Sequence, residues 1–160
     1  MTIQVGDTMP NGAFKVMTAE GPKDLTTNDL FAGKKVLLVS VPGAFTPTCD
    51  KKHLPGYVTE AAALKAKGIS TIAFMAVNDV FVMDAWGKAS NVGDSIKMLA
   101  DGNGDYVKAL GLELDGRGFG MGARGQRFSI IVDNGVVKQL NVEPPGQFDV
   151  SSAQCALGQL

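Results

Sequence analysis

The chain has 160 residues, the length of one domain, and 45% of them are hydrophobic and 19% charged. Its 15 basic and 16 acidic residues leave a formal net charge of −1, so no excess of positive charge favours binding to a nucleic acid. Two cysteines and one histidine are too few for a disulfide framework or a structural zinc site.

The N-terminal segment MTIQVGDTMP lacks the basic region and apolar run of a signal peptide. The strongly apolar runs, such as Val36–Val41, are too short to span a bilayer. We therefore expect a cytoplasmic or similarly reducing location and no membrane partner.

The first predicted elements are short extended segments. One is Phe14–Met17, with turns expected at Asn11-Gly12 and Gly21-Pro22. The nearly continuous apolar run Val36–Val41 then predicts a buried central strand.

A helix is expected next, from about Pro47 to Lys67, ended by Gly68. Pro55 lies inside it and should kink it or break a turn. A second buried strand follows at Ile69–Val77, and Asn78-Asp79 can cap the helix after it.

The second half of the chain predicts a hairpin. A short strand at Ile96–Leu99 and a short helix at Tyr106–Leu110 precede it. The apolar runs Arg127–Val132 and Val136–Val142 flank Asn134-Gly135, a strong signal for a two-residue hairpin turn.

A final helix is expected over about Ser152–Leu160. The order of elements predicts an α/β fold, with a mixed central sheet and helices on both faces, in a single domain over residues 1–160. A central strand that leads into a helix with a cysteine in its first turn is typical of the thioredoxin-like fold.

The cysteine in question is Cys49. Thr46 is a good N-cap residue and Pro47 is favoured at the first helical position, which places Cys49 third in the helix. Its amide is then unpaired, and the positive end of the helix dipole favours the thiolate over the thiol. Asp50 opposes this effect, so a nearby cation is required. The alternative is a cysteine that only packs as a small apolar residue.

The dithiol chemistry of thioredoxins is excluded, because Thr46 stands where their first cysteine would be. Around Cys49 the spacing is Pro42-x-x-x-Thr46-x-x-Cys49. This pattern, together with six strings along the chain, resembles the type II (peroxiredoxin-5-like) subfamily of the peroxiredoxins. The strings are VPGAFTPTC, HLPG, VND, AWGK, RFSIIVDNGVV and LNVEPPG.

The resemblance implies a role for each residue of the pattern. Cys49 would be the peroxidatic cysteine, whose thiolate attacks a hydroperoxide and becomes a sulfenic acid. Thr46, the Cys49 amide and Arg127 would hold the peroxide oxygens, and Arg127 would also offset the charge of Asp50. Pro42 would shield the sulfur from water. No metal, haem, flavin or other cofactor is required, because the sulfur itself is oxidised and recycled.

Other residues suggest functions that we consider less well supported. His53, one turn after Cys49, could act as a base, but packing or hydrogen bonding is the favoured role. The string GMGARG (Gly120–Gly125) matches a dinucleotide motif only formally, and we interpret it as a mobile loop. Trp86 is expected to pack in the core, although partial exposure at a dimer interface is an alternative.

Cys155 has two possible roles. It could resolve the sulfenic acid by forming a disulfide with Cys49. However, a capping box at Ser151-x-x-Gln154 would make Cys155 the fourth helical residue, packed against Val150 as a hydrophobic staple. The subfamily's resolving positions, near Ser151 and Phe74, hold no cysteine here.

The sequence therefore predicts a cytoplasmic thiol peroxidase that reduces hydrogen peroxide and organic hydroperoxides. Glutathione with glutaredoxin, or thioredoxin, would reduce Cys49, and the resemblance implies a homodimer. The alternative is a peroxide-sensing or chaperone-like protein that uses the same cysteine without physiological turnover.

Overall fold

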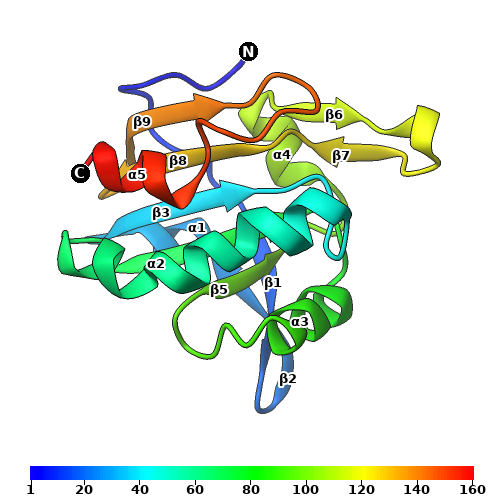
Figure 1. Cartoon of the computed structure of the whole chain (residues 1–160), viewed down its shortest axis with the longest axis horizontal. Coiled ribbons are helices and arrows are strands. Elements are labelled where there is room, and N and C mark those ends of the chain that lie inside the picture. The colour runs from blue at the N-terminus through cyan, green and yellow to red at the C-terminus, as the bar shows by residue number, and fades with distance from the viewer.

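The computed structural model describes residues 1–160 and centres on a seven-stranded mixed sheet (Figure 1). Its strand order is β2-β1-β5-β4-β3-β8-β9. These strands are β1 (Ala13–Thr18), β2 (Gly21–Thr26), β3 (Lys35–Ser40), β4 (Thr71–Ala76), β5 (Lys97–Ala100), β8 (Phe128–Asp133) and β9 (Val136–Val142). The pairs β3–β4 and β4–β5 are parallel, and the other pairs are antiparallel. The expected mixed sheet is confirmed.

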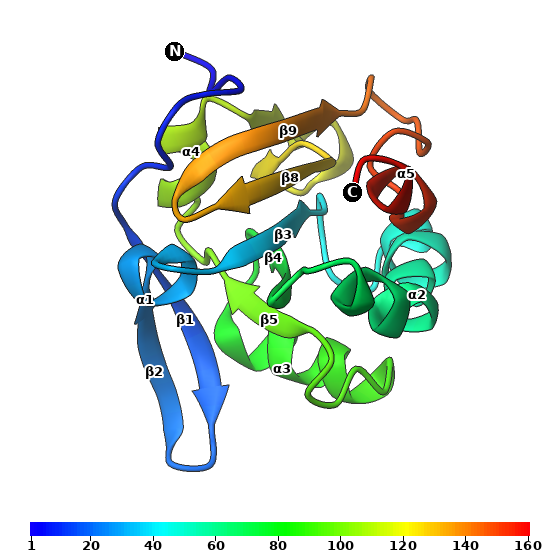
Figure 2. The same ribbon diagram turned by 90° about the vertical axis from the view of Figure 1, so that its left-hand side faces the viewer.

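Helices cover both faces of the sheet, as Figure 2 shows. They are α1 (Thr27–Phe31), α2 (Leu54–Ala66), α3 (Val80–Ala89), α4 (Asp105–Leu110) and α5 (Ala153–Gly158), with a π-helical turn η1 (Cys49–His53) and a 3₁₀ turn η2 (Arg117–Phe119). One hydrophobic core, under α2, α3 and α5, contains Tyr57, Phe74 and Trp86. The second, under α1 and α4, contains Phe14 and Phe128. No helix is both long and apolar enough to cross a membrane.

The helix that begins before Cys49 is irregular at the predicted place. Pro47 and Thr48 are helical, and the π turn η1 follows, closed by the Leu54 amide donating to the Cys49 carbonyl. Pro55, which has no amide hydrogen, then occupies the first turn of α2. The helix break that the sequence predicts at Pro55 therefore takes the form of a wider π turn just before this residue.

The Asn134-Gly135 turn is confirmed: both residues have positive φ, and Asp133 pairs with Val136 across the hairpin. Two other turn predictions were wrong, because Asn11-Gly12 leads into β1 without forming a turn and Gly21-Pro22 is not the hairpin turn. The first hairpin turns at Ala19-Glu20, so Gly21 and Pro22 instead begin the edge strand β2, where a proline costs no ladder bond.

A second correction concerns the string GMGARG. Its last three residues form strand β7 (Ala123–Gly125), which pairs with β6 (Glu113–Asp115), so only its first half is a loop. A strand of three residues is too short to give a periodic pattern in the sequence.

The start of the last helix also differs from the prediction by one residue. Ser152, not Ser151, is the N-cap, and its hydroxyl accepts a hydrogen bond from the Cys155 amide. Cys155 is thus the third helical residue, not the fourth. Val150 is exposed and lies two residues before the N-cap, so it does not occupy the position that the predicted hydrophobic staple with Cys155 requires. Ser151 is buried and has a different partner, described below.

Candidate active site

Cys49 lies beyond the carboxyl end of β3, at the start of the π turn, and is fully buried. The Arg127 guanidinium donates a hydrogen bond through Nη2 to Cys49 Sγ, at 3.0 Å. The Cys49 amide donates no hydrogen bond within the protein. Arg127 is therefore the cation that the sequence required, and both it and the free amide can stabilise negative charge near the sulfur.

The segment between β3 and Cys49 is fixed by hydrogen bonds. Asn78 Oδ1 accepts from the Ala44 amide at 2.9 Å, and Arg124 Nη1 donates to the Pro42 carbonyl at 3.4 Å. Phe45 has a φ of 63°, a strained value for a bulky residue. This loop carries Pro42 and Thr46, so its anchors hold two of the predicted site residues.

Thr46 Oγ1 donates its proton to the Gly43 carbonyl at 2.7 Å. Its lone pairs are left to accept a hydrogen bond from a ligand. No hydrogen bond joins Pro42 or Thr46 to the Cys49 sulfur. Among the predicted site residues, the structure thus joins only Arg127 to Cys49 directly.

The carboxylate of Asp50 is held by α3. Trp86 Nε1 donates to Asp50 Oδ1 at 2.8 Å, and Trp86 is fully buried. Core packing of Trp86 is confirmed. The hydrogen bond links the turn that contains Cys49 to α3, the helix that connects the parallel strands β4 and β5.

His53 is fully buried and contacts Arg127, not the sulfur. Its Nδ1 lies 2.7 Å from Arg127 Nη1 and its Nε2 lies 3.0 Å from the Ser151 carbonyl oxygen. A guanidinium can only donate and a carbonyl can only accept, so Nδ1 is the acceptor and Nε2 carries the proton. The hydrogen-bonding role favoured for His53 is confirmed.

The pKa of His53 is lowered from 6.5 to about 3. Burial is the largest cause, and the Arg127 charge adds to it, whereas the hydrogen bond to Ser151 and the charge of Glu143 act in the opposite direction. His53 is therefore neutral near pH 7, which is the form that can accept a hydrogen bond from Arg127.

The lowered pKa of His53 predicts a pH-dependent stability. The unfolded chain binds a proton near pH 6.5 and the folded chain does not, so stability is present above pH 6.5 and is lost as pH falls toward 3. Between pH 7 and pH 5 this loss should be about 2 kcal/mol. Urea unfolding at both pH values measures it. The variant His53→Gln, which does not titrate, should lose about 2 kcal/mol less than the parent over the same interval; equal losses would contradict the assignment.

Three residues of the site were not identified from the sequence. Asn78 was assigned only to a helix cap, which Asp79 in fact supplies by accepting from the Val82 amide. Arg124 was part of the string GMGARG. Glu143, in LNVEPPG, accepts hydrogen bonds from the segment that leads to α5. None has a local pattern of its own: Asn78 and Arg124 bind residues 34 and 82 positions away, and Glu143 binds across a loop to residues six and eight positions further on.

Cys155 lies in the first turn of α5, partly buried, and both cysteines are free thiols. Its amide is held by the Ser152 cap at 3.2 Å. The first turn of α5 would have to open for Cys155 to move toward Cys49.

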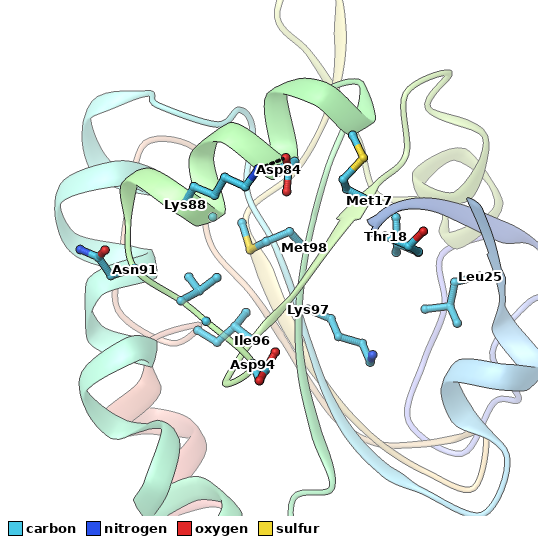
Figure 3. Close-up of a pocket in the computed structure, with 14 residues that line it drawn as sticks. Met17, Thr18, Leu25, Asp84, Lys88, Asn91, Asp94, Ile96, Lys97 and Met98 are labelled. Carbon is cyan, nitrogen blue, oxygen red and sulfur yellow. Dashed lines mark ion pairs between the residues drawn. The ribbon is translucent and has the colours of Figure 1, made fainter. Parts of the chain in front are cut away.

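One cavity lies away from these residues. It has a volume of about 690 Å³ and lies between the β1–β2 hairpin, β5 and α3 (Figure 3). Met17, Leu25 and Met98 line it, and the Asp84–Lys88 ion pair lies at its edge. It contains none of the residues around Cys49.

Comparison with known proteins agrees with this geometry. The Redoxin family matches residues 4–157. Peroxiredoxin-2C of Oryza sativa subsp. japonica is 47% identical, over 95% of this chain and 94% of its own length. The structure of reduced Prx3 from Vibrio vulnificus in complex with H₂O₂ is 53% identical, with a TM-score of 0.95 over 99% of both chains. Peroxiredoxin 5 from Alvinella pompejana is 33% identical, with a TM-score of 0.86 over 99% of both chains.

These likenesses confirm the thioredoxin-like α/β fold and the resemblance drawn from the motifs around Cys49. The chain therefore belongs to the peroxiredoxin family, whose members are thiol-dependent peroxidases.

Proposed function

We propose that the protein reduces hydrogen peroxide and organic hydroperoxides through the thiolate of Cys49. The observation that carries the proposal is the hydrogen bond of 3.0 Å from Arg127 to Cys49 Sγ, at the start of a helix. The Vibrio vulnificus relative, solved in complex with H₂O₂, supports the substrate class. The sulfur attacks one peroxide oxygen, the O–O bond breaks, and Cys49 becomes a sulfenic acid. The leaving oxygen takes a proton and departs as water or an alcohol.

The other site residues have complementary roles in this proposal. Arg127 and the Cys49 amide donate to the peroxide and to the charge that develops on the leaving oxygen. Thr46 accepts the hydrogen bond of the peroxide O–H, because its own proton is engaged by Gly43. Pro42 limits access of water to the sulfur.

We further propose a one-cysteine cycle, in which an external thiol reduces the sulfenic acid. Glutathione with glutaredoxin, or thioredoxin, is the reductant class, and a reducing compartment such as the cytoplasm would supply it. The capped helix around Cys155 supports this cycle, because its cap holds Cys155 in α5.

A homodimer is the assembly we propose. Phe45, on the loop before Cys49, and Phe81, at the start of α3, expose 48% and 64% of their surface. The ring centroids of Phe45 and Trp86 lie 6.4 Å apart, and Trp86 is on the same helix as Phe81. The loop that carries Phe45 is therefore next to α3, beside the Cys49 turn. Exposed aromatic rings of this kind favour an interface between subunits.

One experiment tests the cycle. The reduced protein receives one equivalent of hydrogen peroxide with a sulfenic-acid trap and no other thiol, and its intact mass is measured. We expect a single trap adduct that maps to Cys49, on a protein that native mass spectrometry shows as a dimer. A loss of two hydrogens with a Cys49–Cys155 link would instead make Cys155 the resolving cysteine. A protein that stays reduced would refute the peroxidase proposal. If Cys49 is oxidised rapidly but peroxide is not consumed steadily when a thiol is added, the alternative of a peroxide-sensing protein would be favoured.

A further inference from the structure

We propose that Glu143 is a positioning residue for the site around Cys49, although it does not contact the sulfur. Its carboxylate fixes Ser151, which orients His53, which in turn holds Arg127 against Cys49. The inference rests on the proposed peroxidase function.

Glu143 follows β9 and is 5% exposed. Its Oε2 accepts three hydrogen bonds: from the Asp149 amide at 2.6 Å, the Ser151 amide at 2.9 Å and the Ser151 hydroxyl at 2.7 Å. Its Oε1 is buried without a partner, and no cation pairs with the carboxylate. A buried carboxylate with a free oxygen is costly, so its retention calls for a specific role.

The partner of Glu143 leads directly to the sulfur. The Ser151 carbonyl oxygen accepts from His53 Nε2 at 3.0 Å and from the Tyr57 hydroxyl at 2.7 Å. The opposite nitrogen of His53 accepts from Arg127 at 2.7 Å. Arg127 donates from its other terminal nitrogen to Cys49 Sγ. Because His53 is hydrogen-bonded to both Ser151 and Arg127, a shift of Ser151 would move the imidazole ring and, with it, the Arg127 guanidinium.

The segment that Glu143 holds has little packing of its own. Residues 144–147 are exposed, and two of them are proline and one is glycine. Phe148, next along, places its ring 4.9 Å from the His53 ring and 5.9 Å from the Arg127 guanidinium carbon. By binding the amides of residues 149 and 151, Glu143 closes this segment over both side chains.

The charge of Glu143 suits this role. Burial raises the pKa of Glu143, but the hydrogen bonds from Ser151 and from the Asp149 amide outweigh this effect, so the net pKa lies below the usual value. The carboxylate is therefore ionised near pH 7 and accepts only. Charge-assisted hydrogen bonds to an ionised acceptor are the stronger kind.

The test compares Glu143→Ala with a matched control, Asp101→Ala. Asp101 is also 5% exposed and accepts hydrogen bonds from two backbone amides, but these belong to Tyr106 and Val107, which are part of the other core. We expect Glu143→Ala to slow oxidation of Cys49 by hydrogen peroxide by about 10- to 100-fold, because the Arg127 donor is misplaced. Asp101→Ala should destabilise the fold without slowing that oxidation.

A second readout does not depend on peroxide. His53 is the only histidine, so its ring signals in an NMR spectrum are unambiguous. In the parent we expect a neutral ring protonated on Nε2 that does not titrate between pH 5 and pH 8, since its pKa is about 3. In Glu143→Ala the ring should lose that fixed tautomer and begin to titrate. Glu143→Gln, which keeps an acceptor oxygen, should restore most of both properties.

The outcomes separate the two proposals. If the parent fails to react with peroxide while Glu143→Ala still changes the His53 signals, the peroxidase proposal fails and the positioning role stands. If Glu143→Ala leaves His53 and the oxidation rate unchanged, or slows oxidation no more than Asp101→Ala, the positioning role is refuted. Should Glu143→Ala not fold, Glu143→Asp, whose shorter side chain loses reach, replaces it with the same expected direction.

Discussion

Replacement of Cys49 with Ser is expected to abolish peroxide consumption, with a loss of about 10³-fold or more. A serine hydroxyl stays protonated near neutral pH and is a poor nucleophile, whereas the thiolate attacks directly. The substitution is nearly isosteric at a fully buried position, so the fold should survive. Loss of peroxide in the presence of a small thiol reductant measures the effect.

The matched control is Cys155→Ser. It removes the second of the two cysteines, and in a one-cysteine cycle it should leave the rate unchanged. Turnover that survives in Cys49→Ser would refute the mechanism. Turnover lost equally in both variants would instead require a disulfide in each cycle.

Replacement of Arg127 with Ala should slow oxidation of Cys49 by about 10²- to 10³-fold, the scale of losing one donor that stabilises developing charge. The variant removes the group 3.0 Å from the sulfur and leaves His53 Nδ1 without its donor. Rapid-mixing kinetics with hydrogen peroxide measure the oxidation rate.

Two further variants sharpen this test. Arg127→Lys keeps the positive charge but lacks the two terminal nitrogens of a guanidinium, one for Cys49 and one for His53. It should therefore recover only part of the rate. Arg117→Ala removes an exposed arginine that pairs with Asp115, and it should behave like the parent. An Arg127→Ala oxidation rate equal to that of Arg117→Ala would rule out the assigned role.

The local features of the site could be predicted because each depends on neighbouring residues. Pro47 begins the helix, Asp79 caps α3 and Asn134-Gly135 turns the last hairpin, and each prediction used a conformational preference of one or two residues. The buried strand β3 was equally clear, because its apolar run is continuous.

The misses have equally specific causes. Helix α1 has five residues, too few for a helical pattern, and its Thr26 cap lies among strand residues. Ser151 and Ser152 are both good N-caps, and only tertiary contacts decide between them: Glu143 binds Ser151 and leaves Ser152 to cap α5. The predicted capping box was off by one residue for that reason.

The network behind Arg127 lay beyond sequence reasoning. His53 and Ser151 are 98 positions apart, and Arg127 and Cys49 are 78 apart. The family resemblance suggested the second pair, but no spacing predicts the first. Polar contacts across such separations are set by how the sheet and α2 pack, so they become visible only in three dimensions.

The hydrogen bond between Trp86 and Asp50 makes the tryptophan fluorescence sensitive to the turn that contains Cys49. Trp86 is the only tryptophan, so all indole emission comes from a ring whose nitrogen is bonded to the residue after Cys49. Any movement of the π turn during oxidation must alter that bond or the polarity around the ring. The state of the peroxidatic turn can therefore be followed by intrinsic fluorescence in the native sequence, without an attached dye.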